Sequence, residues 1–101
     1  MSDVISEFID KTGRKIRLTR KQWKHIQKHP HMHNSAEKIE ETIKNPVAIR
    51  HDEFNPKLNY FYKEYKNIDL RERYLFVSVK YLNGDGFVIT SFYTNKITGL
   101  K

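Results

Sequence analysis

The feature that most constrains the fold is the turn sequence Asn83-Gly84-Asp85-Gly86, which lies between two largely apolar segments. Glycines combined with Asn or Asp at such a position are typical of the tight turns that join antiparallel strands. The flanking segments, residues 73–82 and 87–94, are rich in Val, Ile, Phe, Tyr and Thr, so they are predicted to be the two strands. The chain therefore contains an antiparallel sheet.

Symmetry about this turn pairs Leu82 with Phe87, and it follows that Lys80 opposes Ile89, Val79 opposes Thr90 and Ser78 opposes Ser91. The predicted core face carries Leu75, Val77, Val79, Val88, Thr90, Phe92 and Thr94. The predicted open face carries Tyr74, Phe76, Ser78, Lys80, Ile89, Ser91 and Tyr93. A lysine between apolar neighbours in mid-strand indicates either a functional position or a sheet face that is open to water.

Further strands are predicted at residues 4–9, 14–18, 47–50 and 59–65. Thr19 followed by Gln22 matches a capping box, which begins a helix over about 20–29. Asn34 followed by Glu37 repeats the pattern and begins a helix over about 35–44. The element order predicts an α+β fold, with an N-terminal hairpin and two helices packed on a roughly four-stranded antiparallel sheet.

The chain of 101 residues has the size of one domain, so residues 1–101 are expected to form a single domain. The sequence contains no cysteine, which excludes a disulfide scaffold, thiol catalysis and cysteine-ligated zinc. No apolar run approaches the ~20 residues of a membrane span, and no secretory signal is visible. We therefore expect a cytoplasmic protein with no membrane partner.

The charge is concentrated in one part of the chain. The formal net charge is +7, and residues 11–36 hold eight Lys and Arg residues with no acidic residue. The same segment contains His25, His29, His31 and His33. A local basic block with histidines indicates an anionic partner such as nucleic acid. The alternative is that the block is simply a solvated helix face.

The histidines suit proton transfer, because the imidazole titrates near neutral pH. His25 and His29 are four residues apart and would share one face of a helix. This spacing also suits zinc, but no HExxH motif is present, and no cofactor is expected. His29 beside Pro30 could instead be a cation that favours a helix C-terminus.

RNA cleavage without a metal needs a base, an acid and positive charge near the phosphorane oxygens. His29 and His25 could transfer protons, and Lys80 and Arg50 could hold the phosphate. Tyr62 and Tyr93 could stack a base or donate a proton. Tyr62 and Thr90 also fit plain packing within a sheet.

The ordered motifs of the chain resemble a known group of proteins. They are Leu18-Thr19, Trp23, His25-Ile26, His29-Pro30, Ile39, Thr42-Ile43, Asn45-Pro46, Ile49-Arg50, Tyr60-Phe61-Tyr62, Tyr74-Leu75, Val77, Val79-Lys80, Gly86-Phe87-Val88-Ile89-Thr90 and Thr94. Over about residues 16–98 this pattern is similar to the phage-associated proteins of the barnase–EndoU–colicin–RelE ribonuclease superfamily.

The resemblance implies a RelE-like or barnase-like α+β fold and metal-independent endoribonuclease activity, often as a toxin with a neutralising partner. It implies proton transfer by His29, phosphate binding by Lys80 and a hydroxyl role for Thr90. Phe92 stands where many relatives have tyrosine, which weakens any role for an aromatic hydroxyl there. The predicted register places Lys80 and Thr90 on opposite faces, and only a β-bulge would bring them together.

The sequence thus favours an endoribonuclease that uses attack by the 2′-hydroxyl, in a toxin–antitoxin or phage-related system. The predicted catalytic residues are His29, Lys80, Thr90 and Tyr62. The predicted RNA-binding residues are Arg17, Lys21, Lys24, His25, Lys28, Arg50 and Tyr93. The expected partners are RNA and an acidic antitoxin or inhibitor. The alternatives are a non-catalytic RNA- or DNA-binding module and a basic protein-interaction domain on the same scaffold.

Overall fold

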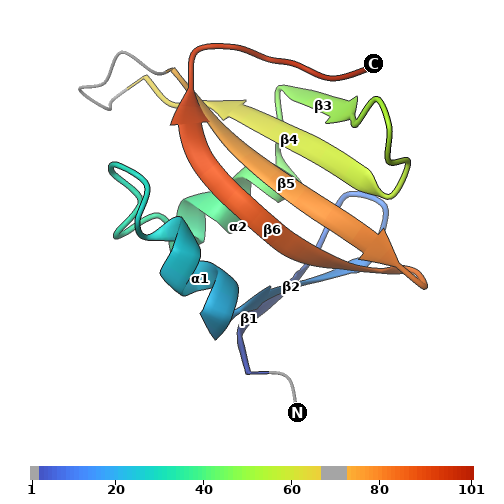
Figure 1. Cartoon of the computed structure of the whole chain (residues 1–101), viewed down its shortest axis with the longest axis horizontal. Helices are drawn as coiled ribbons and strands as arrows, with labels where there is room; N and C mark the ends of the chain where they lie inside the picture. Colours follow the sequence, from blue (N-terminus) through green and yellow to red (C-terminus); the bar gives the residue numbers. More distant parts are fainter. Residues whose placement is uncertain (1–2, 67–72) are drawn as a thin grey trace.

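The computed structural model describes residues 3–66 and 73–101, and Figure 1 shows its arrangement. The elements in chain order are β1 (Val4–Ile9), β2 (Lys15–Thr19), α1 (Arg20–Ile26), α2 (Ala36–Lys44), β3 (Ala48–His51), β4 (Leu58–Glu64), β5 (Tyr74–Leu82) and β6 (Asp85–Thr94). The strands form one sheet in the order β1-β2-β6-β5-β4-β3. The fold is α+β, as the sequence predicts.

The sheet has six strands and is mixed, so the expectation of about four antiparallel strands is wrong. The N-terminal hairpin does not lie apart from the sheet. Its second strand, β2, pairs in parallel with the start of β6 through Ile16–Gly86 and Arg17–Phe87. Gly86 permits this approach, because a Cβ there would lie 2.5 Å from the side chain of Ile16. The short strand β3 extends the other edge by antiparallel pairing with β4.

Helix α1 begins as predicted, with the Thr19 hydroxyl accepting a hydrogen bond from the Gln22 amide. It ends at Ile26 rather than at residue 29. The amides of Lys28 and His29 donate to carbonyls only three residues back, as in a tighter 3₁₀ turn. His29 therefore lies beyond the helix, and the expectation that it shares a helix face with His25 is wrong.

The N-cap of helix α2 is Ser35 and not Asn34, and the Ser35 side chain accepts no hydrogen bond from an amide of the helix. The Ser35 hydroxyl donates instead to the carbonyl of His31, at 3.2 Å. This bond fixes the turn between the helices. Neither helix in the described part of the chain is long and apolar enough to cross a membrane.

The core lies between the helices and one face of the sheet. Ile26, Ile39 and Ile43 of the helical segments are fully buried against apolar side chains from the strands. The strand residues of this core include Ile16, Leu18, Phe61, Leu75, Val77, Val79 and Val88. We call the opposite side of the sheet the open face, because no helix covers it in the described structure (Figure 1).

Candidate functional site

The turn of the last hairpin consists of Asn83 and Gly84 alone, with φ angles of 53° and 86°. Positive φ at both positions is what a two-residue type I′ turn requires, and Asn-Gly is its preferred sequence. Leu82 consequently pairs with Asp85, and the predicted pairing of Leu82 with Phe87 is wrong.

A β-bulge then shifts the register between Ser78 and Val79, so that Ser78 lies opposite Thr90. The additional residue in β6 reverses the faces to which the rest of that strand points. Lys80 is two residues from Ser78 along β5 and so shares its face. Lys80, Ser78 and Thr90 therefore lie together on the open face.

The two-residue turn also overturns the predicted pairings between the turn and the bulge. Lys80 lies opposite Phe87 rather than Ile89, and Val79 opposite Val88 rather than Thr90. Three side chains predicted on the core face lie on the open face in the structure: Thr90, Phe92 and Thr94. Two side chains predicted on the open face lie on the helix side: Ser91 and Tyr93.

A polar row crosses the centre of the open face. Cross-strand pairing aligns Arg50 of β3, Tyr60 of β4, Ser78 of β5 and Thr90 of β6. The Tyr60 hydroxyl donates to the carboxylate of Asp52, and this hydrogen bond raises the pKa of Tyr60 to about 12. Tyr60 therefore stays protonated at neutral pH and offers its ring, rather than a titrating hydroxyl, to a ligand.

A series of aromatic contacts, the aromatic ladder, runs beside this row to His29. The ring centroids are 5.2 Å apart for Tyr60–Phe76, 4.7 Å for Phe76–Phe92 and 5.5 Å for Phe92–His29. These separations are typical of tilted aromatic pairs. The ladder therefore places an imidazole at one end of a surface of aromatic rings.

His29 lies at the rim of the sheet rather than on it. Strand β2 pairs only with the first part of β6, so the later part of β6 has no strand partner on that side among residues 3–66 and 73–101. The turn after α1 lies against this edge. His29 is half-buried there and lines a cavity of about 210 Å³ together with Pro30, His31, Phe92 and Tyr93.

Register gives the distance along β5 from Lys80 to the residue opposite the ring that His29 contacts. Phe92, the ring that His29 contacts, lies opposite Phe76, and Lys80 is four residues further along β5. That separation is about 13 Å at ~3.3 Å per residue. The Ser78–Thr90 pair lies midway, so a phosphate bound over this pair would lie between the imidazole and the ammonium group.

The structure places neither of the two predicted stacking tyrosines as an accessible ring on the open face. Tyr62 points to the open face but is only 1% exposed, and its hydroxyl lies 3.2 Å from the Thr98 hydroxyl. Tyr93 points to the helix side, where its hydroxyl lies 3.4 Å from that of Ser35. Accessible rings on the open face come instead from Tyr60 and Phe92.

The predicted RNA-binding cations divide into two groups. Arg17 is engaged in ion pairs with Glu7 at 3.0 Å and with Asp85 at 2.9 Å. The remaining residues of the α1 segment are exposed on its surface: Lys21, Lys24, His25 and Lys28. Lys21 and Lys24 also line a shallow depression of about 410 Å³. These exposed side chains form the basic edge of the molecule.

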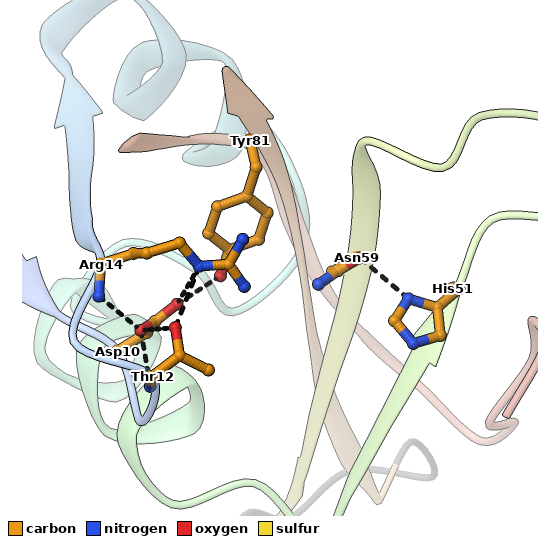
Figure 2. Close-up of polar contacts among 6 residues, drawn as sticks. All are labelled: Asp10, Thr12, Arg14, His51, Asn59 and Tyr81. Carbon is orange, nitrogen blue, oxygen red and sulfur yellow. Dashed lines mark hydrogen bonds and ion pairs between the residues drawn. The ribbon is translucent and has the colours of Figure 1, made fainter. Parts of the chain in front are cut away.

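A second polar cluster lies on the helix side, at the turn between β1 and β2 (Figure 2). One carboxylate oxygen of Asp10 accepts hydrogen bonds from the Thr12 amide and hydroxyl and from the Arg14 amide. The other oxygen accepts from the Tyr81 hydroxyl at 2.7 Å. The Arg14 guanidinium lies 3.7 Å above the Tyr81 ring. Asp10 therefore fixes the turn to the sheet.

Across from this cluster, the His51 ring is hydrogen-bonded to the Asn59 side chain at 3.0 Å (Figure 2). The two groups line a small cavity of about 200 Å³ whose floor includes Phe61. This cavity lies on the side of the sheet opposite Lys80 and Thr90, so it is separate from the polar row of the open face.

Replacing Asp10 with alanine is expected to lower the free energy of unfolding by about 1–3 kcal/mol, because buried donors would lose their acceptor. Burial raises the pKa of Asp10, but the hydrogen bonds from Thr12, Tyr81 and the Arg14 amide outweigh it and hold that pKa below the ordinary 3.8. The stabilisation is therefore present above pH ~4 and is lost as the pH falls through the lowered pKa.

Denaturant unfolding at neutral pH and at about pH 3 tests this expectation. Asp3→Ala is the matched control, since Asp3 is exposed and its ion pair with Arg20 should contribute little. Equal stabilities of wild type and Asp10→Ala at neutral pH would contradict the role of Asp10.

Metal-ligating side chains were also a candidate feature of the sequence. Within residues 3–66 and 73–101, no three His, Asp or Glu side chains form a group that could hold a metal ion. In particular, the histidines at positions 25, 29, 31 and 33 do not form such a group.

Several residues of the candidate site are not among the site residues predicted from the sequence, although Phe76 and Ser78 are predicted on the open face. Ser78 and Tyr60 complete the polar row, and Phe76 with Phe92 joins it to His29. The Asn-Gly dipeptide was the available clue, since a two-residue turn would have paired Leu82 with Asp85. Nothing in the local sequence indicated the bulge that follows.

Comparison with known proteins gives one match. A family model described as phage-Barnase-EndoU-ColicinE5/D-RelE like nuclease2 matches residues 5–101, which is nearly the whole chain. Searches of curated proteins and of solved structures gave no match.

Proposed function

The chain belongs to the phage-Barnase-EndoU-ColicinE5/D-RelE like nuclease2 family, and from this premise we propose that it is a metal-independent endoribonuclease. The scissile phosphate would bind over Ser78 and Thr90, and the 2′-hydroxyl of the preceding ribose would attack it. The observation that carries the proposal is the bulge, which gives Lys80, Ser78 and Thr90 a common face with His29 at its rim.

His29 would act on the attacking group. An imidazole is suited to take the 2′-hydroxyl proton at neutral pH. The new bond forms between the 2′-oxygen and phosphorus, and the bond from phosphorus to the 5′-oxygen breaks. The 5′-oxygen leaves as a hydroxyl with a proton from water. The products are a 2′,3′-cyclic phosphate and a 5′-hydroxyl end.

Lys80 and Arg50 would stabilise the additional negative charge on the phosphorane oxygens. Both lie on the open face, and neither takes part in an ion pair among the described residues. The Thr90 hydroxyl, at the opposite end of the polar row from Arg50, would donate to another phosphate oxygen. Bases of the RNA strand would stack on Tyr60 and Phe92, in place of Tyr62, which is buried, and Tyr93, which points to the helix side.

The experiment is incubation of the protein with single-stranded RNA in the presence of EDTA. Cleavage that persists in EDTA supports the proposal. Salt-sensitive binding without cleavage would favour the alternative of a non-catalytic RNA-binding module. A toxin role would require an acidic inhibitor, which co-purification with the product of a neighbouring gene would identify.

The basic edge is expected to supply sequence-independent affinity for RNA. Substituting Lys21, Lys24 and Lys28 with alanine should weaken RNA binding and make it less sensitive to salt. The slope of log K against log salt should fall by about 2, at ~0.7 for each phosphate contact that is lost on a single strand. Fluorescence anisotropy with labelled RNA at several salt concentrations measures this slope. An unchanged slope would show that RNA does not contact the edge.

A further inference from the structure

A cavity of about 300 Å³ opens on the open face beside the aromatic ladder. Tyr60, Phe76 and Phe92 form its aromatic floor, and Thr94, Lys96 and Thr98 form its wall. Thr94 is the last residue of β6, whereas Lys96 and Thr98 belong to the segment that follows, residues 95–100, which we call the strap. In Figure 1 the strap runs from the end of β6 to the neighbourhood of β3.

The strap is hydrogen-bonded to the sheet at two places, which anchor it. The Thr98 amide donates to the Tyr62 hydroxyl at 3.2 Å. At the far end, Leu100 and His51 exchange two backbone hydrogen bonds of 2.7 and 2.8 Å. Between these anchors Gly99 has φ +95°, and a Cβ there would lie 2.9 Å from the His51 carbonyl. The strap is thus held against the sheet and forms a fixed side of the cavity.

The polar groups of the wall are mainly donors. The Thr94 hydroxyl oxygen already accepts the Lys96 amide at 3.3 Å, so its proton is free to donate. The Lys96 side chain is exposed, and it takes part in no ion pair among the described residues. A flat aromatic floor beside an ammonium and a hydroxyl suits a planar group with acceptor atoms on its edge.

The cavity adjoins the candidate site through Phe92. Phe92 contacts His29 at 5.5 Å and also forms part of the cavity floor. A planar group in the cavity would therefore lie one ring away from the imidazole. In an RNA strand bound along the open face, that group would be the base of a nucleotide beside the cleaved phosphate.

We propose that this cavity is a nucleobase subsite that prefers guanine or uracil, which carry a keto oxygen (O6 or O4) where adenine and cytosine carry an amino group. The base stacks on the aromatic floor and accepts hydrogen bonds from Lys96 and Thr94. Lysine pairs in this way with the O6 and N7 acceptors of guanine in DNA complexes. The inference rests on the proposed function for its ligand, an RNA strand, but it requires no cleavage.

Binding of nucleoside 5′-monophosphates tests the subsite without any chemical step. We expect GMP and UMP to shift the NMR signals of residues 94–98 and to bind at least 5-fold more tightly than AMP and CMP. Lys96→Met should weaken GMP binding about 5- to 10-fold and remove the preference. Lys57→Met, at an exposed lysine outside the cavity, should change neither.

The subsite would be overturned by equal binding of all four nucleotides or by NMR shifts confined to residues outside 94–98. Wild-type GMP affinity and base preference in Lys96→Met would also overturn it. So would the absence of any binding to wild type. RNA cleavage is measured separately on the same proteins. Wild-type protein that cleaves RNA but shows no base preference rejects the subsite alone, whereas wild-type protein that binds base-selectively without cleaving rejects the proposed function alone.

Discussion

Replacement of His29 with alanine is expected to lower the rate of RNA cleavage about 10²- to 10⁴-fold, the range typical of a lost general base. The expectation follows from its position at the rim of the open face, with its ring 5.5 Å from that of Phe92. Because the side chain is only half-buried in a turn beyond α1, the fold should survive the change. Single-turnover cleavage of a labelled RNA measures the effect.

His29→Gln provides a second variant that retains a polar side chain but cannot transfer protons near neutral pH. It should be as defective as His29→Ala and should bind RNA with nearly wild-type affinity. His33→Gln is the matched control, since His33 is exposed in the same inter-helix segment and lines neither cavity near the ladder. Full activity of His29→Gln would remove His29 from the mechanism.

Lys80→Met is expected to reduce cleavage about 10²- to 10³-fold, the usual cost of losing one group that stabilises transition-state charge. Methionine keeps most of the side-chain length and removes the ammonium. Lys80 is two residues from Ser78 on the same face, so its ammonium is placed to reach a phosphate over the Ser78–Thr90 pair. The loss should appear in kcat more than in KM, because the added charge exists only in the transition state.

Lys63→Met is the control for this prediction. Lys63 also lies on a central strand, but it pairs with Leu75 and therefore points to the helix side. Its ammonium donates to the Asn45 carbonyl at 3.3 Å and is remote from the polar row. A similar loss of activity in both variants would indicate a general effect of charge rather than a specific role for Lys80.

Much of the secondary structure could be predicted, because it depends on local features. The N-terminal hairpin, the Thr19 cap and the strands around the Asn-Gly turn all follow from neighbouring residues. The first helix was predicted too long because the tight turn before Pro30 resembles a helix in its periodicity. The parallel pairing of β2 with β6 joins segments about 70 residues apart, and no local pattern encodes it.

The candidate site was only partly predictable for the same reason. His29, Lys80 and Thr90 were identified by residue type and by resemblance, but their common face depends on the bulge between Ser78 and Val79. A one-residue shift reverses every side chain beyond it, and residues 88–91 give no compositional clue to its position. Tyr62 was assigned to catalysis by its residue type. Its burial beneath the strap could not be predicted, because it depends on a long-range contact.

The central claim is that the open face cleaves RNA through the 2′-hydroxyl and without a metal ion. The most direct measurement compares an RNA with the same strand carrying one 2′-deoxynucleotide at the mapped cleavage position, both in EDTA. We expect 2′,3′-cyclic phosphate and 5′-hydroxyl ends from the first strand and no cut at that position in the second. Intact RNA, cleavage abolished by EDTA, or a cut at the deoxynucleotide would contradict it.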